Sequence, residues 1–196
     1  MPNSVTLAAV RAEPIHHPIT AASFASWLDT LGLFESQPHL AVGLSGGVDS
    51  SALMALTQEW AAARGDVTLT ALIVDHGLRP SSADEARRTA EYWRGRGINA
   101  VILTNPNQAP TRAIEETARA DRWALLEGWC QQHGVLHLLL GHHRDDQAET
   151  VLMRLAKASG PVGLSGMARH SHRGQLRVLR PLLSARRAEL AATVEA

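Results

Sequence analysis

Short apolar runs alternate with longer amphipathic stretches along most of this 196-residue chain. The apolar runs predict strands at residues 39–44, 68–74, 98–103, 135–140 and 176–179. The stretches around them predict helices at residues 20–33, 49–63, 82–96, 111–133 and 144–157. Several strands are apolar throughout, which is typical of a parallel sheet that helices cover on both faces. We therefore expect an α/β fold, a doubly wound five-stranded parallel sheet with right-handed crossovers.

A sheet of this kind binds its ligand beyond the carboxyl ends of the strands. Polar residues follow three of the predicted strands: Asp49 after the first, 75–77 after the second and 141–146 after the fourth. We therefore expect one site, assembled from these three segments.

The first segment, Ser-Gly-Gly-Val-Asp-Ser-Ser at 45–51, joins an apolar strand to a predicted helix. Its glycines allow a sharp turn and a close anion, and the helix start offers N–H groups and partial positive charge. A plain Gly/Ser turn explains Ser-Gly-Gly alone, and the G-x-x-x-x-G-K-[ST] pattern is absent. A carboxylate beside phosphates needs a divalent cation between them, so Asp49 predicts a nucleotide with magnesium. The predicted nucleotide-binding residues here are Ser45, Gly46, Gly47, Val48, Asp49, Ser50 and Ser51.

The second segment places Asp75 and His76 at a strand end, where they can hydrogen-bond a nucleobase or ribose. The residues after it have a plainer interpretation as a turn and a helix cap, with Glu85 three positions after Ser82 as in a capping box. Arg79 is equally compatible with a phosphate contact and with solvent.

The third segment carries three acids, Asp145, Asp146 and Glu149, at a predicted helix start. In isolation they are most simply an acidic first turn, which the helix dipole favours. Together with Asp49, they match the oxygen ligands of Mg²⁺, and their spacing with the histidines at 142–143 fits no usual zinc pattern.

Two arginines, Arg119 and Arg122, share a face of the helix predicted before the fourth strand. A surface ion pair of Arg119 with Glu115 is the plain interpretation, whereas the pair could also neutralise a triphosphate or contact RNA. Residues 159–167 are rich in glycine yet apolar, which suits an ordered functional loop or a connector.

Charge is uneven although the formal net charge is +0. Residues 150–196 carry a net +6 and residues 1–149 a net −6, which suggests a polyanionic partner or a solvated basic surface. The single cysteine, Cys130, excludes an internal disulfide. We find no signal peptide and no apolar stretch long enough to span a bilayer, so we expect a cytoplasmic protein with no membrane association.

Five strings stand out together: LSGGVDSS (44–51), VDHGLRPSS (74–82), EETARADRW (115–123), GHHRDDQAET (141–150) and KASGPVGLSGM (157–167). They closely resemble the N-terminal catalytic domain of tRNA(Ile)-lysidine synthetases, a family of the N-type ATP pyrophosphatase (PP-loop) group. The resemblance implies an adenine nucleotide alpha hydrolase-like fold. It also implies a reaction in which ATP adenylates the C2 oxygen of the wobble cytidine of a CAU anticodon. L-lysine then displaces AMP, and pyrophosphate is the other product.

The resemblance also implies roles for individual residues. ATP phosphates would rest on 45–51, and Mg²⁺ would bind Asp49 and Asp146, with Asp145 as a further candidate. Adenosine would lie against Ile73, Asp75, His76, Gly141 and His142. The expected catalytic residues are Asp49, Arg119, Arg122 and Asp146, and the candidate tRNA contacts are Arg79, Arg154, Lys157 and Arg173.

The resemblance covers about residue 38 to the Arg-Pro-Leu-Leu string at 180–183. We expect an N-terminal extension with a helix at 1–37, a PP-loop domain at 38–183 and, at 184–196, the start of a truncated or missing C-terminal region. A homodimer is a candidate assembly. The alternatives are another PP-loop tRNA-modifying or amidating enzyme, although a thiolase would usually need paired cysteines, and a catalytically silent nucleotide- or RNA-binding module.

Overall fold

The computed structural model describes residues 16–77, 79–104, 114–156 and 165–196. Its helices are α1 (Ala21–Asp29), α2 (Val48–Arg64), α3 (Ser82–Arg94), α4 (Ile114–Gln132), α5 (Arg144–Ala156) and α6 (Arg187–Glu195). Its strands are β1 (His39–Leu44), β2 (Thr68–Asp75), β3 (Asn99–Thr104), β4 (His137–Leu140), β5 (His170–Arg173) and β6 (Leu176–Leu179).

The strands form one sheet in the order β3-β2-β1-β4-β6-β5. All neighbours pair in parallel except β5, which runs antiparallel to β6 at the edge. Because β1 pairs with both β2 and β4, the carboxyl ends of these three strands meet at one edge. The predicted α/β fold with a doubly wound parallel sheet is confirmed.

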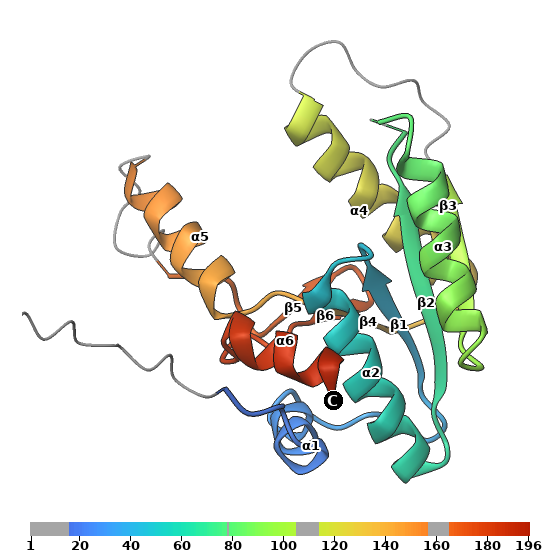
Figure 1. Ribbon diagram of the computed structural model, residues 1–196, viewed down its shortest axis with the longest axis vertical. Coiled ribbons are helices and arrows are strands. Elements are labelled where there is room, and N and C mark those ends of the chain that lie inside the picture. The colour runs from blue at the N-terminus through green and yellow to red at the C-terminus, as the bar shows by residue number, and fades with distance from the viewer. Residues whose placement is uncertain (1–15, 78, 105–113, 157–164) are drawn as a thin grey trace, which may run out of the picture.

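Helices pack on both faces of the sheet because side chains of β1 alternate between them. Leu40 and Val42 join a core that includes residues of α1, α2, α3 and α6, whereas Ala41 joins a second core with α4. Helix α5 contributes no buried residue and extends away from the sheet (Figure 1).

The sheet has one more strand than the five predicted. Strand β5 reads His-Ser-His-Arg and has no buried residue, so no apolar pattern marks it. Its backbone pairing with β6 makes it a strand. An edge strand needs no apolar face of its own, which is why sequence periodicity misses it.

Both ends of the described chain contribute to the main core. Helix α6 was not predicted, yet Leu190 is fully buried and belongs to the same core as Phe24 of α1. The Ile19 N–H donates to Thr193 Oγ1 (2.9 Å), which joins the segment before α1 to α6. The core therefore extends on both sides of residues 38–183. Among the described residues, the structure contains no helix long and apolar enough to cross a membrane.

Candidate functional site

A cavity of about 1040 Å³ lies beyond the carboxyl ends of β1, β2 and β4. Residues from all three predicted segments line it. The predicted site residues on its walls are Ser45, Asp49, Ser50, Ile73, His76, Arg79, Arg119, Arg122, Gly141, His142, Asp146 and Arg154. The tertiary structure thus assembles one site from segments that are up to about 100 residues apart, as strand-end placement requires.

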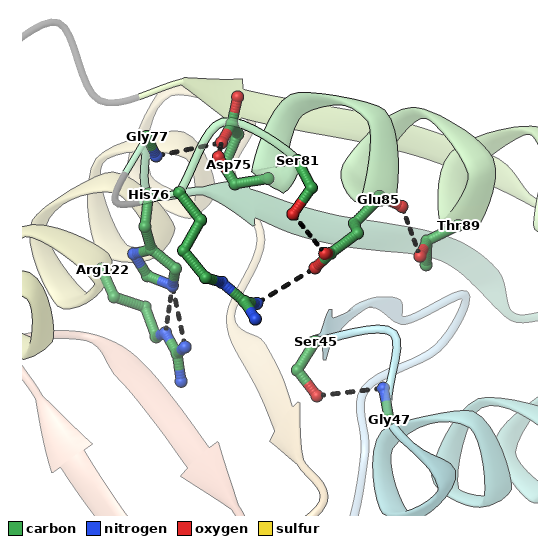
Figure 2. Close-up of polar contacts among 11 residues, drawn as sticks. Ser45, Gly47, Asp75, His76, Gly77, Ser81, Glu85, Thr89 and Arg122 are labelled. Carbon is green, nitrogen blue, oxygen red and sulfur yellow. Dashed lines mark hydrogen bonds and ion pairs between the residues drawn. The ribbon is translucent and has the colours of Figure 1, made fainter.

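The loop between β1 and α2 keeps its own hydroxyls inside the turn. Ser50 Oγ donates to the Gly47 carbonyl (3.0 Å) and accepts from the Ser45 N–H (3.2 Å), while Gly47 N–H points at Ser45 Oγ (Figure 2). No side chain caps the N-terminus of α2. First-turn N–H groups without a cap, together with the helix dipole, are suited to bind an anion.

Two glycines around this loop stand where an added Cβ would crowd its neighbours. Gly46 has a positive φ of 78°, and a Cβ there would lie 2.9 Å from Thr89 Oγ1. A Cβ on Gly141 would lie 3.1 Å from both the Asp49 carbonyl oxygen and Ser50 Cα. The end of β4 therefore packs directly against the start of α2, which brings the third segment onto the first.

The carboxylates of Asp49 and Asp146 meet at one imidazole. His143 Nε2 lies 3.5 Å from Asp49 Oδ2 and 3.7 Å from Asp146 Oδ2. His143 Nδ1 accepts the Asp145 N–H (3.1 Å), so in the neutral ring Nε2 carries the proton and faces both acids. Asp49 Oδ1 is buried without a hydrogen-bond partner among the described residues.

Two carboxylates alone do not fill the coordination shell of a divalent cation, so phosphate oxygens and water would have to supply its other ligands. Within the described residues, no group of three or more His, Cys, Asp or Glu side chains is arranged to hold a metal ion. Mg²⁺ commonly takes one or two carboxylates and completes its coordination with phosphates and water. Two converging carboxylates, one with an unpartnered buried oxygen, are consistent with such a site.

Asp145 lies on the other side of His143. Its carboxylate is 4.0 Å from His143 Nδ1, and it lines a separate, shallower hollow with Arg144 and Arg186. The structure therefore does not bring Asp145 together with Asp49 and Asp146.

Asp75 organises the turn after β2. Its Oδ1 accepts hydrogen bonds from the Gly77 N–H (3.0 Å) and from Ser82 Oγ (2.6 Å). Ser82 is thus in the first turn of α3 and is not its cap, and the residue before it, Ser81, makes no capping bond and donates to Glu85 Oε1 (2.8 Å). The predicted capping box between Ser82 and Glu85 is wrong, because Asp75 takes the Ser82 hydroxyl.

His76 and Arg122 form a contact between β2 and α4. Arg122 Nη2 lies 2.8 Å from His76 Nε2 (Figure 2). Burial, and then the charge of Arg122, lower the pKa of His76, so the ring stays neutral and accepts from the guanidinium. Burial and the neighbouring Arg119 lower the pKa of Arg122.

The other predicted basic residues differ in their surroundings. Arg79 pairs with Glu85 (3.1 Å) at the cavity wall, and Arg154 Nη1 contacts the Ser165 carbonyl oxygen. Arg173 stacks over Trp123 at 4.3 Å and lies 3.3 Å from Glu127, outside the cavity lining. Lys157 lies outside the described residues.

Comparison with known protein families shows where this chain belongs. The PP-loop domain profile matches residues 18–196. The chain belongs to the PP-loop family. All three segments that form the cavity lie within the matched residues.

Two curated relatives of this chain are tRNA(Ile)-lysidine synthases. A tRNA(Ile)-lysidine synthase of a Bradyrhizobium species is 44% identical over 184 residues, covering 91% of this chain and 49% of that protein. The tRNA(Ile)-lysidine synthase of the Wolbachia of Brugia malayi is 37% identical, covering 85% of this chain and 38% of that protein. The chain spans about half the length, or less, of these curated relatives.

Two solved structures resemble this fold at low sequence identity. A U34-tRNA thiolase, NcsA from Methanococcus maripaludis with its [4Fe-4S] cluster, superposes with a TM-score of 0.74 at 21% identity, covering 89% of this chain and 61% of that one. An FMN adenylyltransferase of Candida glabrata with FMN and an ATP analogue gives 0.57 at 14% identity, covering 89% of this chain and 55% of that one. These likenesses concern the fold alone.

Three residues of the PP-loop site were not among the predicted ones. His143 lies between the two acids, and Gln147 Nε2 donates to the Met167 carbonyl (2.8 Å), which holds the 165–168 segment on the cavity wall. Both stand in the GHHRDDQAET string, and membership of that string is the signal that the sequence offered for them. Arg180 also lines the cavity; it opens the Arg-Pro-Leu-Leu string at which the resemblance ends, but no local pattern assigned it to the site.

Proposed function

We propose that this PP-loop chain carries the adenylation site of a tRNA(Ile)-lysidine synthase. One observation carries the proposal: the uncapped loop before α2 and the Asp49–Asp146 pair open into a single cavity with Arg119 and Arg122. The curated relatives at 44% and 37% identity bear this name. The substrates would be ATP, L-lysine and the isoleucine tRNA with a CAU anticodon.

ATP would place its triphosphate on residues 45–51 and its adenosine against the ends of β2 and β4. The strand-end residues Ile73, Gly141 and His142 lie on the cavity wall there, which supports this orientation. The Asp75 carboxylate accepts a hydrogen bond from the Gly77 N–H within its own turn, so its part in nucleotide binding would be to hold His76 and Gly77 in place.

Asp49 and Asp146 would hold Mg²⁺ at the triphosphate. The bound ion would neutralise the charge that develops on the pyrophosphate leaving group. Arg119 and Arg122 would add positive charge across the cavity, and Arg122 is held in place by His76. Catalysis would otherwise consist of positioning the C2 oxygen of the cytidine in line with the α-phosphorus.

The tRNA would enter with an unstacked wobble base, as single-stranded loops allow. Arg79 and Arg154 line the cavity and are the better placed of the predicted tRNA contacts, whereas Arg173 would act outside it. Activity on tRNA would place the protein in the cytoplasm. A homodimer remains a prediction for sedimentation analysis with tRNA.

The direct test is pyrophosphate release by the purified chain with ATP, L-lysine and a CAU-anticodon tRNA. We expect release that depends on both lysine and tRNA, with lysidine in the recovered RNA. Turnover on a thiolation or amidation substrate without lysine would instead assign a sibling PP-loop enzyme. ATP binding with no turnover on any of these would assign a silent nucleotide-binding module.

A further inference from the structure

Arg180 presents an unpaired guanidinium edge at the cavity wall. It follows β6, and its backbone N–H donates to the Arg169 carbonyl (2.8 Å). Its Nη1 donates to the Ala168 carbonyl (3.0 Å) and to Ser171 Oγ (3.1 Å), which fixes the plane of the group. Nε is buried without a hydrogen-bond partner among the described residues, and Nη2 makes no hydrogen bond with them either.

The surroundings of Arg180 are positively charged. Burial, then Arg119, then Arg173 lower the pKa of its guanidinium. Arg119 and Arg122 line the same cavity, and Arg180 forms no ion pair with any carboxylate whose side chain the structure describes. Like charges that gather without a counter-ion destabilise one another, and a bound anion would relieve this repulsion.

An oxyanion bound at this edge of Arg180 would give the buried Nε the hydrogen-bond partner that it lacks. Nε–H and Nη2–H point the same way and match the two oxygens of a carboxylate or phosphate. His142 lies nearby: burial, then Arg180, lower its pKa, and its buried Nδ1 has no partner among the described residues.

This edge is separate from the loop at 45–51. Ser45 and Ser50 follow β1, whereas Arg180 follows β6, and β4 lies between these strands in the sheet. We propose that Arg180, supported by Arg119, binds an oxyanion of the second substrate and not the triphosphate. This inference rests on the proposed function. The oxyanion has two possible sources, the α-carboxylate of the amino acid and a phosphodiester of the RNA.

The test compares Arg180→Gln with Arg180→Lys and a matched control, Arg88→Gln. Arg88 is exposed on α3, outside the cavity, and makes no side-chain hydrogen bond or ion pair with the described residues. ATP affinity is measured by calorimetry with the full chain, KM is measured for lysine and lysinamide, and Kd is measured for the tRNA at several salt concentrations. Thermal melts establish that each variant is folded.

For Arg180→Gln we expect ATP affinity within about twofold of the parent chain and a loss of about tenfold or more for the second substrate. If the carboxylate is the ligand, KM rises for lysine and not for lysinamide, and tRNA affinity is unchanged. If an RNA phosphate is the ligand, Kd for tRNA rises and its log–log salt slope falls by about 0.7–0.9. Arg180→Lys, which keeps the charge and loses the two-pronged edge, should be intermediate.

Three results would overturn the inference. Arg180→Gln could leave KM for lysine and Kd for tRNA unchanged, or Arg88→Gln could change them equally. Arg180→Gln could also weaken ATP binding as much as it weakens binding of the second substrate. A parent chain without lysine-dependent turnover would instead refute the proposed function. In that case direct calorimetric binding of lysine and of tRNA, parent against Arg180→Gln, still decides the role of Arg180: weaker binding of one of them supports it, and unchanged binding refutes it.

Discussion

At the scale of single residues, the site depends on side chains whose partners come from other segments. Asp49 shows this: Oδ2 faces His143, Oδ1 is buried without a partner in the described chain, and its own carbonyl packs on Gly141. The sequence predicted that Asp49 and Asp146 share a site. The fold brings them together, because both carboxylates lie near His143 Nε2.

Asp49→Asn should reduce turnover about 100-fold or more, equivalent to about 2.7 kcal/mol of transition-state stabilisation, because the amide keeps the shape but loses the charge that would hold Mg²⁺. Pyrophosphate release measures it, and a thermal melt should be close to that of the parent chain. Asp29→Asn, an exposed change on α1, is the control and should retain full turnover. Near-normal turnover of Asp49→Asn would refute the magnesium role.

At the scale of elements, close packing sets the alignment of strand ends and helix starts. The contact of Gly141 with the start of α2 fixes β4 relative to the loop at 45–51. Helix α6 packs on α2 from the opposite end of the sequence. Neither contact is local, so neither has a sequence signature.

Gly141→Ala should lower ATP affinity by about tenfold or more, about 1.4 kcal/mol, because its Cβ would push the Asp49 and Ser50 backbone away. Calorimetric titration of ATP measures this. Gly128→Ala is the matched control: nothing lies within 4 Å of its Cβ, and alanine within α4 should raise stability by up to about 1 kcal/mol. Equal ATP affinity in the two variants would contradict the packing argument.

Leu190→Ala should destabilise the fold by about 2–5 kcal/mol, because this fully buried side chain anchors α6 in the main core. Urea unfolding measures the loss. Val194→Ala, on the same helix but 44% exposed, should change the free energy of unfolding by only about 0.5 kcal/mol or less. Similar losses for both would mean that α6 does not contribute to the core in solution.

At the scale of the whole molecule, buried histidines couple stability to pH. Burial is the first cause that lowers the pKa of His39, His76, His137 and His142. His137 shows the consequence: although Glu35 raises its pKa, the net direction is down, so a neutral ring donates Nε2–H to Glu35 Oε2 (2.6 Å). The folded state therefore binds fewer protons than the unfolded chain in mild acid.

The urea midpoint should be constant above about pH 7 and should fall as pH drops through about 6.5 toward the lower pKa values of the folded histidines. The sign follows because the unfolded chain takes up the protons first. His137→Gln should flatten this slope, while His172→Asn, an exposed change on β5, should not. A midpoint that does not change between pH 7.5 and 5 would contradict the prediction.

The sequence by itself determined the features that depend only on residues close together in the chain. The apolar run and Ser-Gly-Gly turn around 39–51 specify a strand, a sharp turn and a helix start, because spacing and glycine act within a few residues. The recurrence of such units specifies a parallel sheet, and a parallel sheet gathers its carboxyl ends at one edge.

The tertiary structure alone decided which neighbouring residues enter the site. Asp146 faces the cavity and Asp145 a different hollow, and the Ser82 hydroxyl goes to Asp75 instead of a cap. Arg180 reaches the cavity only because β6 lies next to β4 in the sheet. These outcomes depend on strand order and on competition for partners far along the chain, and a local pattern contains no information about either.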